Sequence, residues 1–131
     1  MKFDKEKIKT FVKLTLGCTC PEEVFEYIDC QSNIKLNDDI LLHNKINIGN
    51  RLLIYVVEAN NTGLIENVLP FLVNTGKKER DNLRFNRFRL VLVTDRFNEI
   101  KESAECLFKT INKDEKAHLH VIKKQKVPSI F

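Results

Sequence analysis

Residues 16–28 read LGCTCPEEVFEYI and hold the clearest candidate for chemistry in the chain. Cys18 and Cys20 stand one residue apart, directly before Pro21. Proline suits the first position of a helix, because the N–H group that it lacks has no partner there. We therefore predict a short helix over about 21–28, with Cys20 as its N-cap. Unpaired N–H groups and the positive end of the helix dipole favour a thiolate over a thiol at this place.

The cysteine pair predicts thiol redox chemistry, with Cys18 and Cys20 as the catalytic residues. A disulfide between them closes a tight ring, and a strained disulfide oxidises other thiols more readily than a relaxed one. Glu22, Glu23 and Glu26 act in the opposite direction, because nearby negative charges disfavour a thiolate. The sequence therefore leaves undecided whether the chain is an enzyme.

The same pair belongs to a candidate metal site for zinc or iron. Cys30 follows one short helix later, and His118 and His120 lie two apart on an expected strand, so that they point to one face. Zn²⁺ takes four nitrogen or sulfur ligands, and strong zinc signatures contain two C-x-x-C pairs. Because this chain has a single, shorter pair, the prediction favours no bound cofactor and two solvent-facing histidines.

The other cysteines carry weaker signals. Cys106 lies about 240° around its expected helix from Ile100, away from the apolar face, so it is a poor core residue. Cys30 is expected to be a small buried hydrophobe, which is the commonest state of a free cysteine. Cys106 and His43 complete the set of residues that a fourth metal ligand could come from.

Composition places the chain among ordinary globular domains. It has 131 residues, of which 43% are apolar and 31% are charged, and its net charge is +4. This length predicts a single domain over residues 1–131. No stretch approaches the roughly 20 apolar residues that span a bilayer, so no membrane partner is expected. The charged N-terminus lacks the apolar centre of a signal peptide, which predicts a cytoplasmic protein with reduced cysteines.

Hydrophobic periodicity predicts the elements that must position these residues. The expected strands are 12–16, with a continuing helix as the alternative, 52–57, 89–95 and 117–123. The expected helices are 4–11, 21–28, 62–76, with Pro70 as a kink or restart, and 98–112. Gly49 and Asn50 indicate a hairpin. The resulting fold class is α/β, a mixed sheet of about five to six strands with three or so helices and strand–helix–strand–helix–strand order in the C-terminal half.

Two further functions belong to other classes. The first is a non-catalytic interaction module, a homo-oligomer that associates through an exposed sheet edge near the hairpin. The second is binding of nucleic acid through residues 77–89, where arginines alternate with phenylalanines that could stack on bases. The second is less favoured, because the same segment is explained by a helix end, a loop and a strand whose alternate side chains enter the core.

A resemblance rests on the segment TLGCTCPEEVF, residues 15–25. It is similar to a stretch found in a family of small prokaryotic proteins that has no assigned function. The resemblance covers under a tenth of the chain, and it implies a family without implying an activity. The order of strand, cysteines and helix also resembles the opening of thioredoxin-like proteins, although the spacing here is C-x-C and the proline follows the pair.

Overall fold

A computed structural model describes residues 4–17, 21–36, 40–59 and 62–126. The N-terminal elements are α1 (Lys5–Thr10), the π-helical turn η1 (Phe11–Thr15) and the 3₁₀-helix η2 (Glu22–Glu26). The central elements are β1 (Ile28–Lys35), β2 (Leu41–Ile48), β3 (Leu52–Glu58) and α2 (Thr62–Leu83). The C-terminal elements are β4 (Arg87–Thr94), α3 (Phe97–Ile111), β5 (Ala117–Lys123) and the 3₁₀-helix η3 (Lys124–Lys126).

The five strands form one mixed sheet, whose spatial order β1-β2-β3-β4-β5 is also the chain order. β1, β2 and β3 pair antiparallel, whereas β3, β4 and β5 pair parallel. Parallel neighbours need a long crossover connection, and α2 and α3 supply the two crossovers. The predicted α/β class, with its mixed sheet and alternating C-terminal half, is confirmed.

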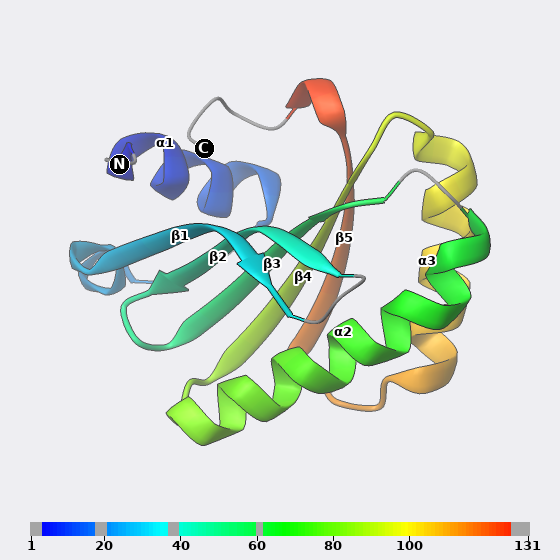
Figure 1. The fold of residues 1–131 in the computed structure, drawn as a ribbon. Coiled ribbons are helices and arrows are strands. Elements are labelled where there is room, and N and C mark those ends of the chain that lie inside the picture. Colours follow the sequence, from blue (N-terminus) through cyan, green and yellow to red (C-terminus); the bar gives the residue numbers. More distant parts are fainter. Residues whose placement is uncertain (1–3, 18–20, 37–39, 60–61, 127–131) are drawn as a thin grey trace.

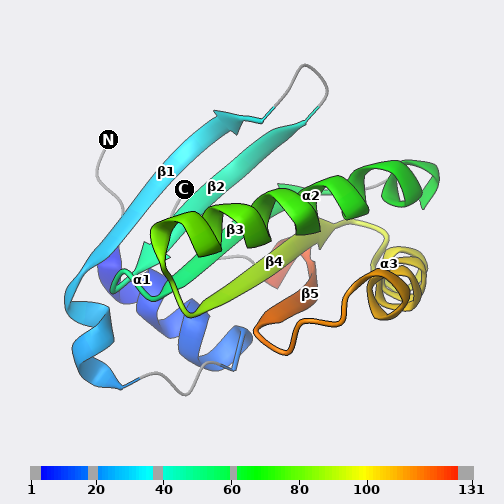
Figure 2. The ribbon, with the colours of Figure 1, turned by 90° about the horizontal axis from the view of Figure 1, so that it is seen from below.

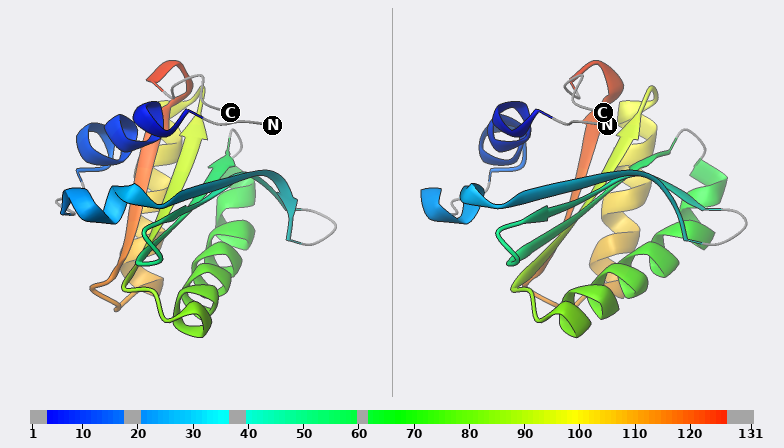
Figure 3. Two further views of the ribbon diagram at one scale, coloured as in Figure 1. Left: turned by 90° about the vertical axis from the view of Figure 1, so that its left-hand side faces the viewer. Right: turned by 60° about the vertical axis from the view of Figure 1, so that its left-hand side comes forward.

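Helices cover both faces of the sheet. Figure 3 shows α1 on one side of the strands and α2 and α3 on the other, and Figures 1 and 2 show the same two layers from two further directions. β3 lies in the middle, and its successive side chains point to opposite faces. The side chains in the core beneath α1 are Leu52, Ile54 and Val56. Those in the core beneath α2 and α3 are Leu53, Tyr55 and Val57. The predicted strand over 52–57 is confirmed, and it is buried on both faces.

The chain stays helical after α1, so the predicted strand over 12–16 is wrong and the alternative holds. Asp4 caps α1, because its side chain accepts hydrogen bonds from two backbone N–H groups of the first turn. The residues that enter the core are Ile8, Phe11, Val12 and Leu16. This spacing is helical, whereas Leu14, which completes the apparent alternation, is 80% exposed.

The region after the cysteines differs from the predicted helix over 21–28. η2 has only five residues, begins at Glu22 with Pro21 as its cap residue, and gives way to β1 at Ile28. β1 is a strand that the sequence did not predict, because most of its eight side chains are polar or only half-buried. The apolar pattern therefore carried no strand signal for this edge of the sheet.

The hairpin between β2 and β3 is confirmed. Gly49 and Asn50 have φ angles of 60° and 55°, and the Arg51 N–H donates to the Ile48 carbonyl at 3.0 Å. Two positive φ angles at the central positions are typical of a type I′ turn, whose twist matches that of paired strands.

α2 runs without interruption through Pro70 and presses closely on the sheet. Gly76 faces Phe88 of β4, and a Cβ atom placed on Gly76 would lie 2.1 Å from the phenylalanine ring. Glycine is therefore required at this crossing of helix and strand. Within the described ranges, none of the helices has both the length and the apolar character needed to cross a bilayer.

Candidate functional site

Cys18 and Cys20 lie outside the described residues, so the site must be built from the residues on either side of them. Leu16 and Gly17 precede the pair at the end of the α1–η1 layer, and Pro21 and Glu22 follow it at the start of η2. Leu16 is buried in the core beneath α1, and Val24 and Phe25 of η2 are buried in the same core. Both ends of the segment are thereby anchored to one face of the sheet.

On the N-terminal side of the pair, an arginine of the sheet binds the main chain. The guanidinium of Arg89, on β4, donates a hydrogen bond from Nη1 to the Leu16 carbonyl at 3.0 Å. The two residues are 73 positions apart in the sequence, and the packing of Leu16 against the sheet brings them together. The positive charge of Arg89 is thus held at the main chain of Leu16, two residues before Cys18 in the sequence.

Arg89 belongs to a cluster that we call the basic quartet, which consists of Arg87, Arg89, His118 and His120. The arginines are two residues apart on β4 and the histidines are two residues apart on β5, so all four side chains point to the α1 face of the sheet. Arg87 Nη1 lies 3.1 Å from His118 Nε2, and Arg89 Nη1 lies 2.8 Å from His120 Nε2. Arg89 and His118 are also direct neighbours in the parallel ladder.

Burial and like charge shift the pKa values of the quartet. Burial, reinforced by Arg89 and His118, lowers the pKa of His120 to about 4. Burial and the two arginines also lower the pKa of His118, and burial and Arg87 lower the pKa of Arg89. No carboxylate in the described part of the chain forms an ion pair with either arginine that would offset these effects. His120 is therefore a neutral hydrogen-bond acceptor at pH 7.

On the C-terminal side of the pair, lysines compensate a glutamate. Lys9 and Lys13 of the N-terminal helical layer both form ion pairs with Glu22. Their hydrogen bonds lower the pKa of the Glu22 carboxyl to about 2. A cleft of about 520 Å³ opens here between α1 and η2, and Phe25 and Ile28 form its apolar part. The opposition to a thiolate that was expected from Glu22 is accordingly reduced by two positive charges.

The predicted support from a helix dipole is smaller than expected. η2 starts at Glu22 rather than at Pro21, and a 3₁₀-helix of five residues aligns few peptide dipoles. The predicted role of Cys20 as an N-cap falls outside the described residues, and Pro21 is the residue that caps η2. Among the described residues, electrostatic support for a thiolate at Cys18 or Cys20 would come from the side chains of the quartet and of the α1–η1 layer.

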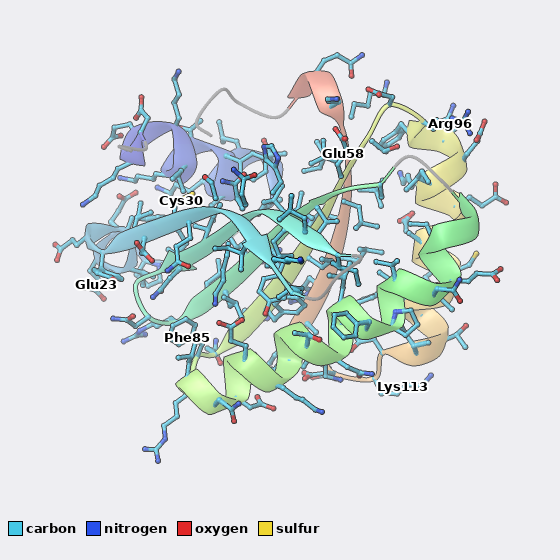
Figure 4. The ribbon with its side chains drawn as sticks, viewed as in Figure 1. Glu23, Cys30, Glu58, Phe85, Arg96 and Lys113 are labelled. Atoms are coloured by element: carbon cyan, nitrogen blue, oxygen red, sulfur yellow. The ribbon has the colours of Figure 1, made fainter. Side chains whose placement is uncertain are left out.

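Cys30 and Cys106 are free cysteines, of which the first is half-buried and the second is exposed. Cys30 lies on β1 and packs half-buried against the core beneath α1 (Figure 4). Burial raises its pKa to about 11, so it remains a thiol at pH 7. Cys106 is exposed on α3, on the other side of the sheet, which confirms that it faces away from the core.

Asn44 of β2 connects Cys30 to Ser32 in a small, partly buried polar cluster. Its side-chain amide donates to Ser32 Oγ at 3.1 Å and to Cys30 Sγ at 3.6 Å. Asn44 is fully buried, and its Oδ1 atom has no hydrogen-bond partner among the described residues. Asn44 also lies between two cores along β2. Ile46 belongs to the core beneath α1, and Leu42 belongs to the core beneath α2.

Among the described residues, the metal candidates do not converge on one point. His118 and His120 share a face, as the sequence predicts, but each lies against an arginine. Cys30 lies on β1 and the two histidines on β5, at opposite edges of the sheet. Four strand spacings separate these edges by roughly 19 Å, so Cys30 and the histidines cannot hold the same ion. In the part of the chain that the structure describes, no three His, Cys, Asp or Glu residues are placed to bind a metal.

The basic segment 77–89 is divided between different environments. Phe88 is buried against α2, on the face of β4 opposite to Arg87 and Arg89. Arg80 is also buried and binds Asp114 at 2.7 Å. Phe88 is therefore not available to stack on bases beside these arginines, as the nucleic-acid interpretation requires. The alternative explanation is a strand whose alternate side chains enter the core, and it is confirmed for Phe88.

Sequence reasoning missed the quartet as a unit. The available signal was the two-residue spacing of Arg87 and Arg89 and of His118 and His120 on strands predicted to be parallel. Which residues become neighbours depends on the register, which the sequence does not reveal. Comparisons with protein-family models, with curated proteins and with solved structures gave no match, so the geometry of these residues carries the functional argument alone.

Proposed function

We propose that this chain is a cytosolic thiol protein in which Cys18 and Cys20 exchange electrons with disulfides. The observation that supports the proposal is the hydrogen bond from the Arg89 guanidinium to the Leu16 carbonyl, two residues before Cys18. A neighbouring cation lowers the pKa of a thiol because it stabilises the thiolate. The ion pairs of Glu22 with Lys9 and Lys13 act in the same direction, since they offset the negative charge that stands nearest to the cysteine pair in the sequence.

The chemistry requires two cysteines and one external disulfide. One thiolate attacks a sulfur of the substrate disulfide, which forms a mixed disulfide and releases the first substrate thiolate. The second cysteine of the pair, as a thiolate, then attacks the mixed disulfide, which closes the Cys18–Cys20 bond and releases the second substrate thiolate. Two electrons pass from the cysteine pair to the substrate, and the protons of both cysteines end on the released thiols or in solvent.

The first experiment measures the pKa of the two thiols from the rate of alkylation against pH. The background is Cys30→Ser with Cys106→Ser, so that only Cys18 and Cys20 react. We expect at least one pKa below the unperturbed 8.5, because Arg89 binds the main chain at Leu16, two residues before Cys18 in the sequence. Adding Arg89→Gln should raise that pKa and slow alkylation at pH 7 severalfold. The matched control is Arg96→Gln, since Arg96 is exposed at the start of α3 (Figure 4), the helix on the opposite face of the sheet from α1 (Figure 3).

Two results would contradict the thiol proposal. The first is a pKa of 8.5 or higher for both thiols. The second is an equal effect of Arg89→Gln and Arg96→Gln, which would indicate net charge rather than proximity. Elemental analysis of protein purified under reducing, anaerobic conditions is run in parallel, because stoichiometric zinc or iron would instead make the cysteines metal ligands. Cys18→Ser and Cys20→Ser should each leave the free energy of unfolding within about 1 kcal/mol of the original.

Self-association through a sheet edge is the alternative function, and β1 is the edge strand nearest the hairpin. Asn33 has a φ angle of 55° in the middle of β1, which breaks the extended backbone that another strand would pair with. Continuous pairing would then be limited to the residues before Asn33. Light scattering over a wide concentration range tests this function, and a monomer at all concentrations would exclude it.

A further inference from the structure

We propose that the basic quartet binds a tetrahedral oxyanion of the phosphate type, either free or as the terminal group of a larger ligand. The site is formed by Arg87, Arg89, His118 and His120, and it requires neither Cys18 nor Cys20. It therefore stands or falls independently of the thiol chemistry proposed above.

The first argument is the size of the cluster. Adjacent strands are about 4.8 Å apart, and alternate residues of one strand are about 6.6 Å apart. Side chains at four such positions can converge on one oxyanion, particularly where two of them are arginines with planar, forked donors. The contacts between Arg87 and His118 and between Arg89 and His120 show that these side chains already lean toward one another across the strands.

The second argument is uncompensated charge. Two arginines lie two residues apart on the same face, and neither pairs with a carboxylate in the described part of the chain. Arg89 is half-buried, and its Nε atom is buried with no acceptor among the described residues. A buried, unpaired cation is unfavourable, and an anion bound beside it removes that penalty. By contrast, the buried Arg80 has its own carboxylate partner in Asp114.

The third argument is the hydrogen-bonding character of the site. Each arginine faces the Nε2 atom of a histidine, so the neutral histidine accepts at Nε2 and carries its proton on Nδ1. The acceptor atoms of the histidines are thus already used within the cluster. What the quartet has left to offer a ligand is N–H donors, which suits an oxyanion that presents only acceptors.

Accessibility completes the case. Arg87 is exposed at the start of β4, whereas Arg89, His118 and His120 are partly buried behind it. A ligand can reach Arg87 from solvent and then contact groups from which water is partly excluded. Hydrogen bonds to charged groups are stronger where the surroundings are less polar.

The test is titration of the full chain with inorganic phosphate at low ionic strength, followed by calorimetry and by NMR of the imidazole resonances. We expect saturable binding that shifts the resonances of His118 and His120. Arg87→Gln and Arg89→Gln should each weaken binding at least tenfold, while Arg96→Gln, which removes the same charge from the start of α3, should leave it unchanged. Arg87 is exposed, so its replacement should leave the fold intact even if Arg89→Gln does not fold, which far-UV circular dichroism will show.

A parallel titration with phenyl phosphate distinguishes a terminal phosphate group, which should bind more tightly than the free ion, from a site that admits only the free ion.

Three results would overturn the proposal. One is the absence of saturable binding to the original chain by either phosphate compound. Another is an equal loss of affinity with Arg87→Gln and Arg96→Gln, which would indicate attraction to net charge alone. The third is binding of a single-stranded oligonucleotide without binding of either phosphate compound, which would indicate a polyanion surface instead of a discrete oxyanion site.

Discussion

Gly76→Ala is expected to lower the free energy of unfolding by about 2–3 kcal/mol, which is the range for an overpacked core. The added methyl group would lie 2.1–2.5 Å from three atoms of the Phe88 ring, well inside van der Waals contact. Phe88 is itself fully buried in the core beneath α2 and α3 and meets Tyr55 edge-on with ring centroids 5.0 Å apart. The ring therefore has little room to yield. Chemical denaturation monitored by circular dichroism measures the loss.

The control for Gly76→Ala uses the helix itself. In an exposed part of a helix, glycine to alanine stabilises by up to about 1 kcal/mol, so a stabilised variant would show that α2 does not approach β4 so closely. Asn74→Ala, at an exposed position of α2, should have little effect. Phe88→Leu combined with Gly76→Ala should be less destabilised than the sum of the two single changes, because the smaller side chain leaves space for the methyl group.

The second large effect is expected from pH. His120 has a pKa of about 4 in the folded protein against 6.5 in the unfolded chain. The unfolded chain therefore takes up a proton between these values and the folded protein does not. The contribution of neutral His120 to the free energy of unfolding is complete above pH 6.5 and is lost as the pH falls toward 4. A shift of this size corresponds to about 3 kcal/mol.

His120→Gln isolates this contribution. Glutamine keeps an acceptor for the Arg89 guanidinium but does not titrate, so the variant should lose less stability between pH 6.5 and 4 than the original chain. Glu22 and Asp114 also have lowered pKa values, and they destabilise both proteins alike on acidification. The informative quantity is the difference between the two unfolding curves at each pH. Parallel pH profiles would show that His120 is not buried against Arg89.

The parts of the fold that sequence analysis predicted are those whose signal is local. β3 is a continuous apolar run, α3 repeats apolar residues at helical spacing, and Gly49-Asn50 needs only its own backbone preference to form a turn. β1 carries no such signal, since it is a polar edge strand held by its pairing with β2. In the segment 12–16, three apolar residues alternate by chance, and only the packing of Val12 and Leu16 against the sheet distinguishes a helix from a strand.

The candidate site could be predicted only in part for the same reason. The cysteine pair and its flanking glutamates are visible in the sequence, and so are the basic residues of β4 and β5. The contact between Arg89 and Leu16, just before the pair, is not visible, because these residues are 73 positions apart and meet through tertiary packing. The compensation of Glu22 by Lys9 and Lys13 likewise depends on how α1 and η2 lie against each other.

The agreement between spatial and chain order of the strands has a consequence for folding. Each strand pairs with the strand before it in the chain, so no pairing within the sheet spans more than one crossover helix. The α1–η1 layer is the exception, because its core includes Val91 and Val93 of β4 and Ile122 of β5. Docking of this layer closes a long loop and should follow completion of the sheet. The surroundings of the cysteine pair would then be assembled in the last step, after the rest of the chain has been synthesised.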